Sequence, residues 1–284
     1  MSNVNGQMSN VSFVFFGTPQ ISVDVLNILK AEGFSPSLVV TSPDKPQGRG
    51  MRVSPPPVKV WAVENNIPVL QPGNLDPDFT YQLTNLQTYK LFVVVAYGKI
   101  LPKEIIDIPE KGTINLHYSL LPKLRGSSPV ETAILDNINP TGVSTILMDE
   151  KMDHGPILLQ EEVYFENWPL AKEKIFEELN ERGGKILAKT IKLWTAGEIK
   201  TKEQDDSNAT YTKKIKKDDG LIDLNDNSAL NYQKYLTYHP WPGIFFFKDG
   251  KRIKITDAEL KDSKLLIKKI IPEGKKEADY KNFK

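Results

Sequence analysis

The stretch Ser12–Pro19, with the sequence SFVFFGTP, decides the fold class. Its four consecutive apolar residues, Phe13–Phe16, have the length of a strand that is buried on both faces. Residues 21–29 then carry apolar side chains at helical spacing, and Leu38–Val40 forms the next short apolar run. A strand, a helix and a second strand in this order predict a right-handed crossover and a parallel sheet. We therefore expect an α/β, Rossmann-like domain with a mostly parallel sheet.

The turn after the first strand limits which ligand this sheet can bind. It lacks the glycine pattern that brings a dinucleotide pyrophosphate against a helix N-terminus, so a nicotinamide-dependent enzyme is disfavoured. Leu91–Val95 predicts a central strand that leads into Ala96-Tyr97-Gly98. Open α/β sheets bind ligands at the carboxyl ends of their strands. Residues 96–98 are therefore a candidate ligand-binding loop.

A chemically distinctive stretch is Gly112–Pro122, which predicts a short strand running into a proline-terminated loop. Side chains alternate along a strand, so Asn115 and His117 are expected on one face. The amide can donate a hydrogen bond to a developing oxyanion, and the imidazole can move a proton near neutral pH. Asp153 is the candidate carboxylate that orients the imidazole. These three side chains would form a minimal set for acyl transfer. The alternative interpretation of the residues alone is a structural strand histidine and a turn-forming aspartate.

A basic segment follows the second predicted strand. Residues 41–57 are rich in proline and glycine, which predicts a long irregular loop. Lys45, Arg49 and Arg52 are spread along it, as is typical of a loop that contacts a phosphate backbone. The alternative interpretation is an ordinary surface loop.

The C-terminal part differs in composition from the rest. Residues 200–284 hold 19 Lys and Arg against 14 Asp and Glu, which indicates either a polyanionic partner or a solvated basic surface. Three apolar or alternating runs from Ile244 onward predict strands, with Asp249-Gly250 as a hairpin turn. We expect a first domain over residues 1–197, a charged linker over 198–209, and a small β-rich domain over 210–284.

Composition excludes several classes of protein. No apolar run approaches the roughly 20 residues that a membrane span requires, and no secretory signal is visible. The chain has no cysteine, which fits a cytoplasmic protein and removes disulfides and thiolate metal ligands. Its three histidines are scattered, so we expect metal-free chemistry.

Taken together, these motifs resemble the folate-dependent formyltransferase family over nearly the whole chain, and in particular its methionyl-tRNA formyltransferases. The catalytic signature is shared with sugar-nucleotide and glycinamide-ribonucleotide formyltransferases, whereas the basic loop and the HPWP turn favour the tRNA enzymes. The matching motifs are FFGTP at 15–19, PDKPQGRG at 43–50, PVK at 57–59, AYG at 96–98, NLHYSLLP at 115–122 with RG at 125–126, MDHGPI at 152–157 and HPWP at 239–242.

The resemblance implies transfer of a formyl group from 10-formyltetrahydrofolate to the α-amine of initiator methionyl-tRNA, for translation initiation. By position, the catalytic set would be Asn115, His117 and Asp153, with Asp153 fixing the tautomer of His117. The basic loop would enter the acceptor stem through Lys45, Arg49 and Arg52. The folate would contact Ser119, Leu120, Leu121 and Pro122, and its pocket would be lined by Ala96, Tyr97 and Gly98. His154 is expected to be a solvent-facing turn residue. We expect a monomer.

One part of the chain departs from the family pattern. The segment from Ile244 onward is shorter and shows three clear strands, where the corresponding oligonucleotide-binding barrel has five. We therefore expect a shortened, OB-like C-terminal domain as the candidate tRNA-binding part. Two rival functions stay open: a sugar-nucleotide N-formyltransferase with the same catalytic set, and a non-catalytic tRNA- or folate-binding relative.

Overall fold

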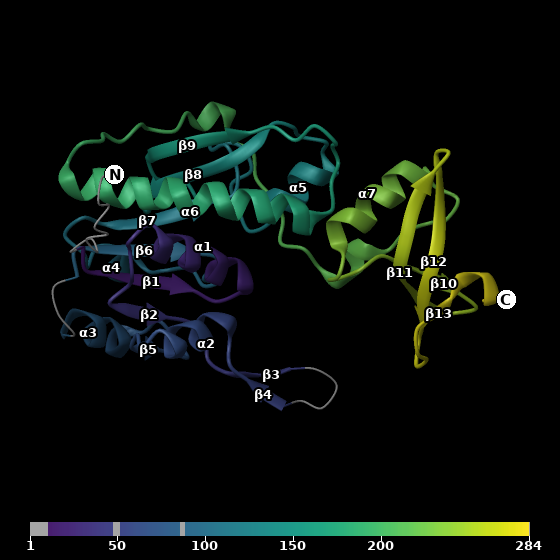
Figure 1. Ribbon diagram of the computed structural model, residues 1–284, viewed down its shortest axis with the longest axis horizontal. Coiled ribbons are helices and arrows are strands. Elements are labelled where there is room, and N and C mark those ends of the chain that lie inside the picture. Colours follow the sequence, from purple (N-terminus) through teal and green to yellow (C-terminus); the bar gives the residue numbers. More distant parts are fainter. Residues whose placement is uncertain (1–10, 48–51, 86–88, 284) are drawn as a thin grey trace, which may run out of the picture. The chain divides into compact units, whose positions relative to one another are not determined.

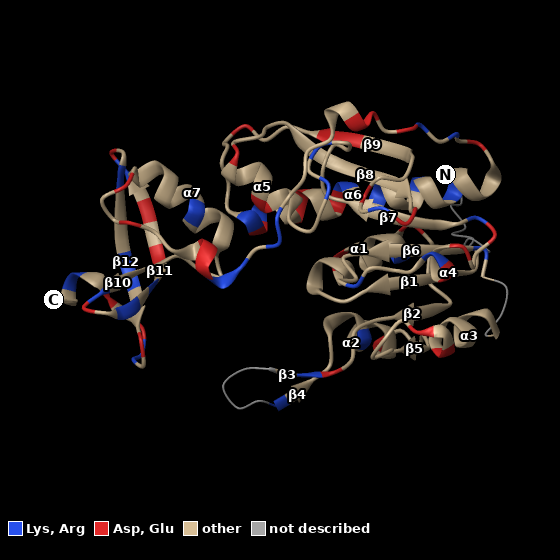
Figure 2. Ribbon diagram, turned by 180° about the vertical axis from the view of Figure 1, so that it is seen from behind, with Lys and Arg blue, Asp and Glu red and all other residues tan. Residues whose placement is uncertain are grey.

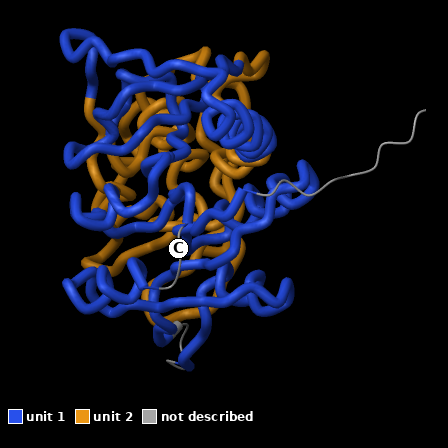
Figure 3. The backbone as a smooth tube through the Cα atoms, turned by 90° about the vertical axis from the view of Figure 1, so that its left-hand side faces the viewer, with its two compact units in different colours: residues 1–125, 142–163, 178–210 blue, residues 126–141, 164–177, 211–284 orange. Residues whose placement is uncertain are grey.

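The computed structural model describes residues 11–47, 52–85 and 89–283 (Figure 1). The chain divides into two compact units, each assembled from three separate stretches of sequence (Figure 3). Unit 1 comprises residues 1–125, 142–163 and 178–210, and unit 2 comprises residues 126–141, 164–177 and 211–284.

Unit 1 is built on a seven-stranded sheet with the strand order β5-β2-β1-β6-β7-β8-β9. The pairs β5–β2, β2–β1, β1–β6 and β6–β7 are parallel, and β7–β8 is antiparallel. The predicted α/β fold with a mostly parallel sheet is therefore confirmed. The strands are β1 (Phe13–Gly17), β2 (Leu38–Val40), β5 (Val69–Leu70), β6 (Leu91–Val95), β7 (Thr113–His117), β8 (Thr141–Leu147) and β9 (Ile157–Val163).

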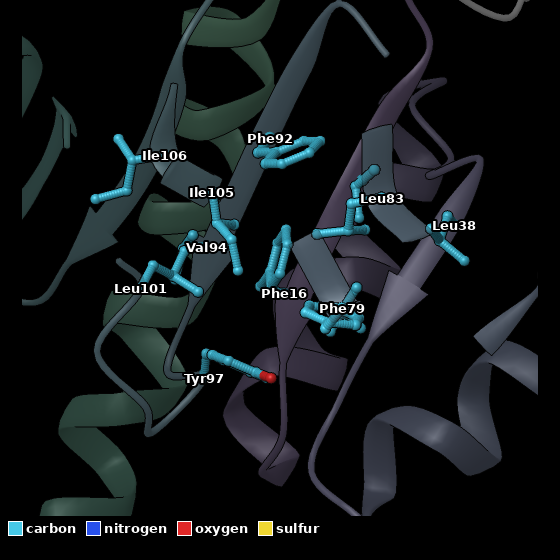
Figure 4. Close-up of a cluster of buried hydrophobic side chains, with 12 residues drawn as sticks. Phe16, Leu38, Phe79, Leu83, Phe92, Val94, Tyr97, Leu101, Ile105 and Ile106 are labelled. Atoms are coloured by element: carbon cyan, nitrogen blue, oxygen red, sulfur yellow. The ribbon is translucent and has the colours of Figure 1, made fainter. Parts of the chain in front are cut away.

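Helices cover both faces of this sheet (Figure 1), which explains why β1, β2 and β6 are buried along their whole length. On one face, Phe16 and Phe92 pack with Phe79, Leu83 and Ile105 in a buried cluster (Figure 4). The helices that contribute to unit 1 are α1 (Gln20–Ala31), α2 (Pro57–Glu64), α3 (Pro77–Asn85), α4 (Lys103–Ile106) and residues 178–196 of α6 (Lys172–Ala196). In the described part of the chain, no helix is both long and apolar enough to cross a membrane.

Helix α6 approaches its neighbours in unit 1 closely at two consecutive glycines. A Cβ atom on Gly183 would lie 3.0 Å from Cδ2 of Leu116 in β7. A Cβ atom on Gly184 would lie 2.7 Å from both Cβ and Cγ2 of Ile28 in α1. Only glycine allows this approach without a shift of the packed side chains.

Overpacking a core usually costs about 1–3 kcal/mol, and alanine regains about 1 kcal/mol over glycine in a helix. We therefore expect Gly184→Ala to lower the free energy of unfolding by a net amount of up to about 2 kcal/mol. The denaturation midpoint in urea measures the change. Gly73→Ala is the control, because nothing lies within 4 Å of its added Cβ atom. Equal or greater stability of Gly184→Ala would contradict the close packing.

The predicted irregular loop over residues 41–57 is wrong in part. Lys45–Gln47 (β3) and Arg52–Ser54 (β4) pair as antiparallel strands. Asp44, just before β3, accepts hydrogen bonds from Lys59 Nζ at 2.8 Å and Gln71 Nε2 at 2.7 Å. The hydrogen bond from Lys59 holds the pKa of Asp44 below its usual range. Proline and glycine content indicated a loop, but the flanking residues are extended and pair with each other.

Unit 2 contains a four-stranded antiparallel sheet with the order β10-β11-β12-β13. Asp249 and Gly250 have φ values of 50° and 73° and form the predicted hairpin turn. In the described residues β10 and β13 are the two edges of an open sheet. The elements are α5 (Pro129–Leu135), α7 (Ser228–Tyr238), β10 (Phe245–Lys248), β11 (Lys251–Lys261), β12 (Lys264–Pro272) and β13 (Ala278–Asp279). The small antiparallel C-terminal domain is confirmed as β-rich.

Candidate active site

Several loops meet at the carboxyl edge of the parallel strands. Because β1, β2, β6 and β7 run in the same direction, their carboxyl ends lie along one edge. Thr18, after β1, donates a hydrogen bond through Oγ1 to the carbonyl of Tyr97 at 3.0 Å, and this Oγ1 lies 3.2 Å from Ser42 Oγ. The loops after β1, β2 and β6 are thus joined. His117 ends β7 at the same edge.

Asn115, His117 and Asp153 converge on one carboxylate oxygen. Asn115 and His117 lie two residues apart on β7, and Asp153 lies in the connection between β8 and β9. Asn115 Nδ2 donates to Asp153 Oδ1 at 3.3 Å, and His117 Nδ1 lies 3.6 Å from that oxygen. The His117 and Asp153 side chains are only 6% and 16% exposed. The structure therefore brings together the amide, imidazole and carboxylate groups that the sequence predicted as the catalytic set.

The tautomer of His117 is set by a backbone carbonyl. His117 Nε2 lies 2.9 Å from the carbonyl oxygen of Leu124, and because a carbonyl only accepts, Nε2 carries the hydrogen. The family resemblance implies this role for Asp153, whereas the geometry gives it to the Leu124 carbonyl. Nδ1 is then the nitrogen that can accept a proton, and Asp153 lies on that side of the ring. A protonated ring would be stabilised by this carboxylate.

Left-handed backbone occurs at three non-glycine residues of this site. Leu124, Asp153 and Ala96 have φ values of 60°, 48° and 47°. Aspartate tolerates this region, but a leucine there costs about 1–2 kcal/mol. Such strain persists only where the surroundings hold the residue in place. Nothing in the local sequence indicated that Leu124 is a functional position.

His154 is not the solvent-facing turn residue that the sequence suggested. Its side chain is 27% exposed, its Nδ1 lies 2.6 Å from Asp149 Oδ2, and its Nε2 lies 3.3 Å from Asp206 Oδ2. Asp206 also accepts a hydrogen bond from Arg125 at 2.7 Å, which holds the pKa of Asp206 below its usual range. His154 is therefore part of a charged network beside the turn that carries Asp153.

The residues predicted to bind folate differ in what they present. Ser119 is fully buried and donates through Oγ to the Lys123 carbonyl at 2.6 Å, and Leu121 packs with Ile146 and Ile157. Tyr97 is 2% exposed in the core of Figure 4, where burial raises its pKa to about 12. These three side chains point into the protein, so their contacts with a ligand would use the backbone. Leu120, Pro122 and Ala96 are half-buried and Gly98 is exposed.

Two of the three residues predicted to bind tRNA lie on the β3–β4 hairpin. Lys45 on β3 and Arg52 on β4 are both exposed. Basic positions of the hairpin are coloured blue in Figure 2. Arg49 lies outside the described residues. The two described cations therefore sit on one short antiparallel ribbon.

The fold and this site define the class of protein: the chain belongs to the formyl transferase family. The family model "Formyl transferase" matches residues 9–191, and the model "Formyl transferase, C-terminal domain" matches residues 214–268. Among curated relatives, the chain is similar to the methionyl-tRNA formyltransferase of Thermodesulfovibrio yellowstonii. The two are 40% identical over 248 residues, which are 87% of this chain and 80% of the relative. The predicted family resemblance is confirmed.

Solved structures share the fold at low sequence identity. A sugar N-formyltransferase from a Shewanella species matches with a TM-score of 0.66 and 17% identity, over 89% of this chain and 100% of that one. HypX from Aquifex aeolicus, in complex with tetrahydrofolic acid, matches with a TM-score of 0.66 and 15% identity, over 95% of this chain and 46% of that one.

Proposed function

We propose that this protein transfers the formyl group of 10-formyltetrahydrofolate to the α-amine of initiator methionyl-tRNA. The observation that carries the proposal is the convergence of Asn115, His117 and Asp153, in a chain 40% identical to a methionyl-tRNA formyltransferase. The family and the activity of that relative support a one-carbon transferase.

Each of the three side chains has a role in this reaction. The α-amine attacks the formyl carbon, a C–N bond forms, and the carbonyl oxygen becomes an oxyanion. Asn115 Nδ2 donates a hydrogen bond to that oxyanion, a contribution of about 3–4 kcal/mol where such donors have been removed. His117 Nδ1 accepts the proton from the amine. It then gives this proton to the folate nitrogen as the bond between the formyl carbon and that nitrogen breaks. Asp153 stabilises the imidazolium between these steps.

The loops at the carboxyl edge fit a folate as the formyl donor. A pterin ring presents amide-like donors and acceptors, which backbone groups of residues 96–98 and 119–122 can pair with. The tetrahydrofolate in the HypX structure supports the same class of ligand.

The β3–β4 hairpin is the proposed contact with the acceptor stem of the tRNA. We expect Arg49→Ala and Arg52→Ala each to weaken tRNA use and to reduce the slope of log affinity against log salt by about one unit, because one phosphate contact is lost. Folate binding should not change. Formylation rates at several salt concentrations measure the slope. Lys103→Ala is the control, since that exposed side chain pairs with Asp107. If the slope of log affinity against log salt is unchanged in both variants, the hairpin does not contact the tRNA phosphates and is an ordinary surface hairpin.

The C-terminal part, residues 210–284 beyond the linker, is the second proposed tRNA contact. Its described sheet carries three cations near the start of β11, namely Lys251, Arg252 and Lys254, of which Arg252 and Lys254 share one face. These are suitable for phosphate groups without specifying a base sequence.

Formylation of charged initiator tRNA, compared with charged elongator tRNA and with a nucleotide-linked aminosugar, tests the proposal. The sugar N-formyltransferase of similar fold makes the aminosugar the relevant rival acceptor. We expect formyl-methionyl-tRNA from the initiator alone. Formylation of the aminosugar instead would establish the rival enzyme, and binding without turnover would establish a non-catalytic relative.

A further inference from the structure

We propose that Gln204 and Thr210 are positioning residues that set the geometry of His117 and Asp153. Both belong to residues 202–210, here called the clamp segment. The inference rests on the proposed function. The sequence predicted a linker for most of this segment, yet the structure ties it to the two loops on which the candidate catalytic set depends.

Thr210 holds the loop whose carbonyl orients His117. Thr210 Oγ1 accepts the N–H of Leu124 at 2.8 Å, and its own carbonyl accepts the N–H of Arg125 at 2.8 Å. Leu124 is the residue in left-handed conformation whose carbonyl faces His117 Nε2. One threonine therefore holds both peptide groups that flank the Leu124 Cα, and the second of these contains the carbonyl that faces His117.

Gln204 holds the turn that carries Asp153. Gln204 Nε2 donates to the carbonyls of Asp153 at 2.9 Å and Gly155 at 2.7 Å. Gln204 Oε1 accepts from Arg125 Nε at 3.1 Å and Arg125 Nη2 at 2.9 Å. A guanidinium only donates and a carbonyl only accepts, so the orientation of the amide is unambiguous.

Arg125 connects the two halves of this arrangement. It is 1% exposed, it follows Leu124 in the chain, and it also pairs with Asp206 of the clamp segment. A continuous path of hydrogen bonds thus runs from the Asp153 turn through Gln204 and Arg125 to the loop that orients His117. Catalysis depends on the placement of reacting groups to within about 1 Å, and such a misplacement can cost about 100-fold in rate.

Two nearly isosteric substitutions separate this role from folding. Gln204→Glu keeps the acceptor for Arg125 but removes the donor to the Asp153 turn. Thr210→Val removes the acceptor for Leu124, and Thr210→Ser restores it. We expect kcat to fall by about 10–100-fold in Gln204→Glu and Thr210→Val, while KM for both substrates stays close to the wild-type value. Thr210→Ser should recover the rate.

The tautomer of His117 provides a readout besides activity. The chain has three histidines, so the ring nitrogens can be assigned by NMR. We expect the wild-type protein to hold hydrogen on Nε2 and Thr210→Val to show a mixture of tautomers. Ser207→Ala is the control, because its hydroxyl donates to Asp205 within the clamp segment and, among the described residues, makes no hydrogen bond to the Leu124 loop or the Asp153 turn.

The outcomes distinguish the two proposals. An unchanged kcat in Gln204→Glu and Thr210→Val, or a loss that tracks the unfolded fraction in circular dichroism, would overturn the positioning role. An inactive wild-type protein would overturn the proposed function instead. In that case the positioning role is tested by the NMR measurement of the tautomer, which does not require activity. An unchanged His117 tautomer in Thr210→Val would reject the role.

Discussion

His117→Ala should lower the single-turnover rate of formylation by roughly 10²–10⁴-fold, the usual contribution of a positioned acid–base group. The physical reason is that Nδ1 is the proton-accepting nitrogen once Nε2 is bonded to the Leu124 carbonyl. Without it, the amine proton must leave to water and the folate nitrogen must depart without a donor. Rapid-quench measurement with excess enzyme isolates the chemical step from product release.

Two further variants serve as controls for the rate and for folding. His239→Ala is the matched control, since that histidine is exposed and lies in unit 2. With enzyme at saturating concentration its single-turnover rate should equal that of the wild type, because any change in tRNA affinity does not enter the chemical step. His117→Gln keeps a side-chain donor, the amide Nε2, for the Leu124 carbonyl, so its folding should resemble that of the wild type while its rate remains low. A rate for His117→Ala equal to that of the wild type would defeat the acid–base assignment.

Asp153→Asn should also lower the single-turnover rate by roughly 10²–10⁴-fold, because it removes the charge that stabilises the imidazolium in a largely buried site. Asparagine has nearly the same shape and tolerates the left-handed backbone of this position, so the turn should be kept. Circular dichroism and the same rapid-quench assay measure folding and rate separately.

Asp149→Asn is the control for this second variant. Asp149 pairs with His154, one residue from Asp153, and it does not contact the candidate catalytic set through any bond described above. A full rate in Asp153→Asn would mean that the carboxylate serves the turn alone. A loss in Asp149→Asn equal to that in Asp153→Asn would assign the effect to the charged network instead.

The parts of the fold that sequence predicts are those in which one physical requirement dominates. Phe13–Phe16 and Leu91–Val95 are buried on both faces, so an unbroken apolar run identifies each strand. The alternation of side chains along a strand likewise places Asn115 and His117 on one face. These features depend on residues that are adjacent in the chain.

The parts that sequence does not predict depend on distant partners or on very short elements. The β13 strand has two residues and α4 has four, too few for any periodicity to appear. Gln204 bonds to carbonyls 49 and 51 residues away, and no local pattern marks that partnership. The N–H of Leu124 donates to Thr210, which is 86 residues distant. Positioning of the site is therefore less visible in the sequence than its chemistry.

The division of unit 2 among three stretches limits how its basic sheet could be transplanted. Leu135 of α5 packs against the buried cluster of that sheet, and Gln233 of α7 donates to the carbonyl of Ile134. Residues 126–141 and 164–177 are encoded before the sheet, inside the stretch that supplies the candidate catalytic loops. A chimaera that exchanged only residues 211–284 would leave these contacts without their partners. Residues 126–141 and 164–177 must therefore be exchanged together with the sheet.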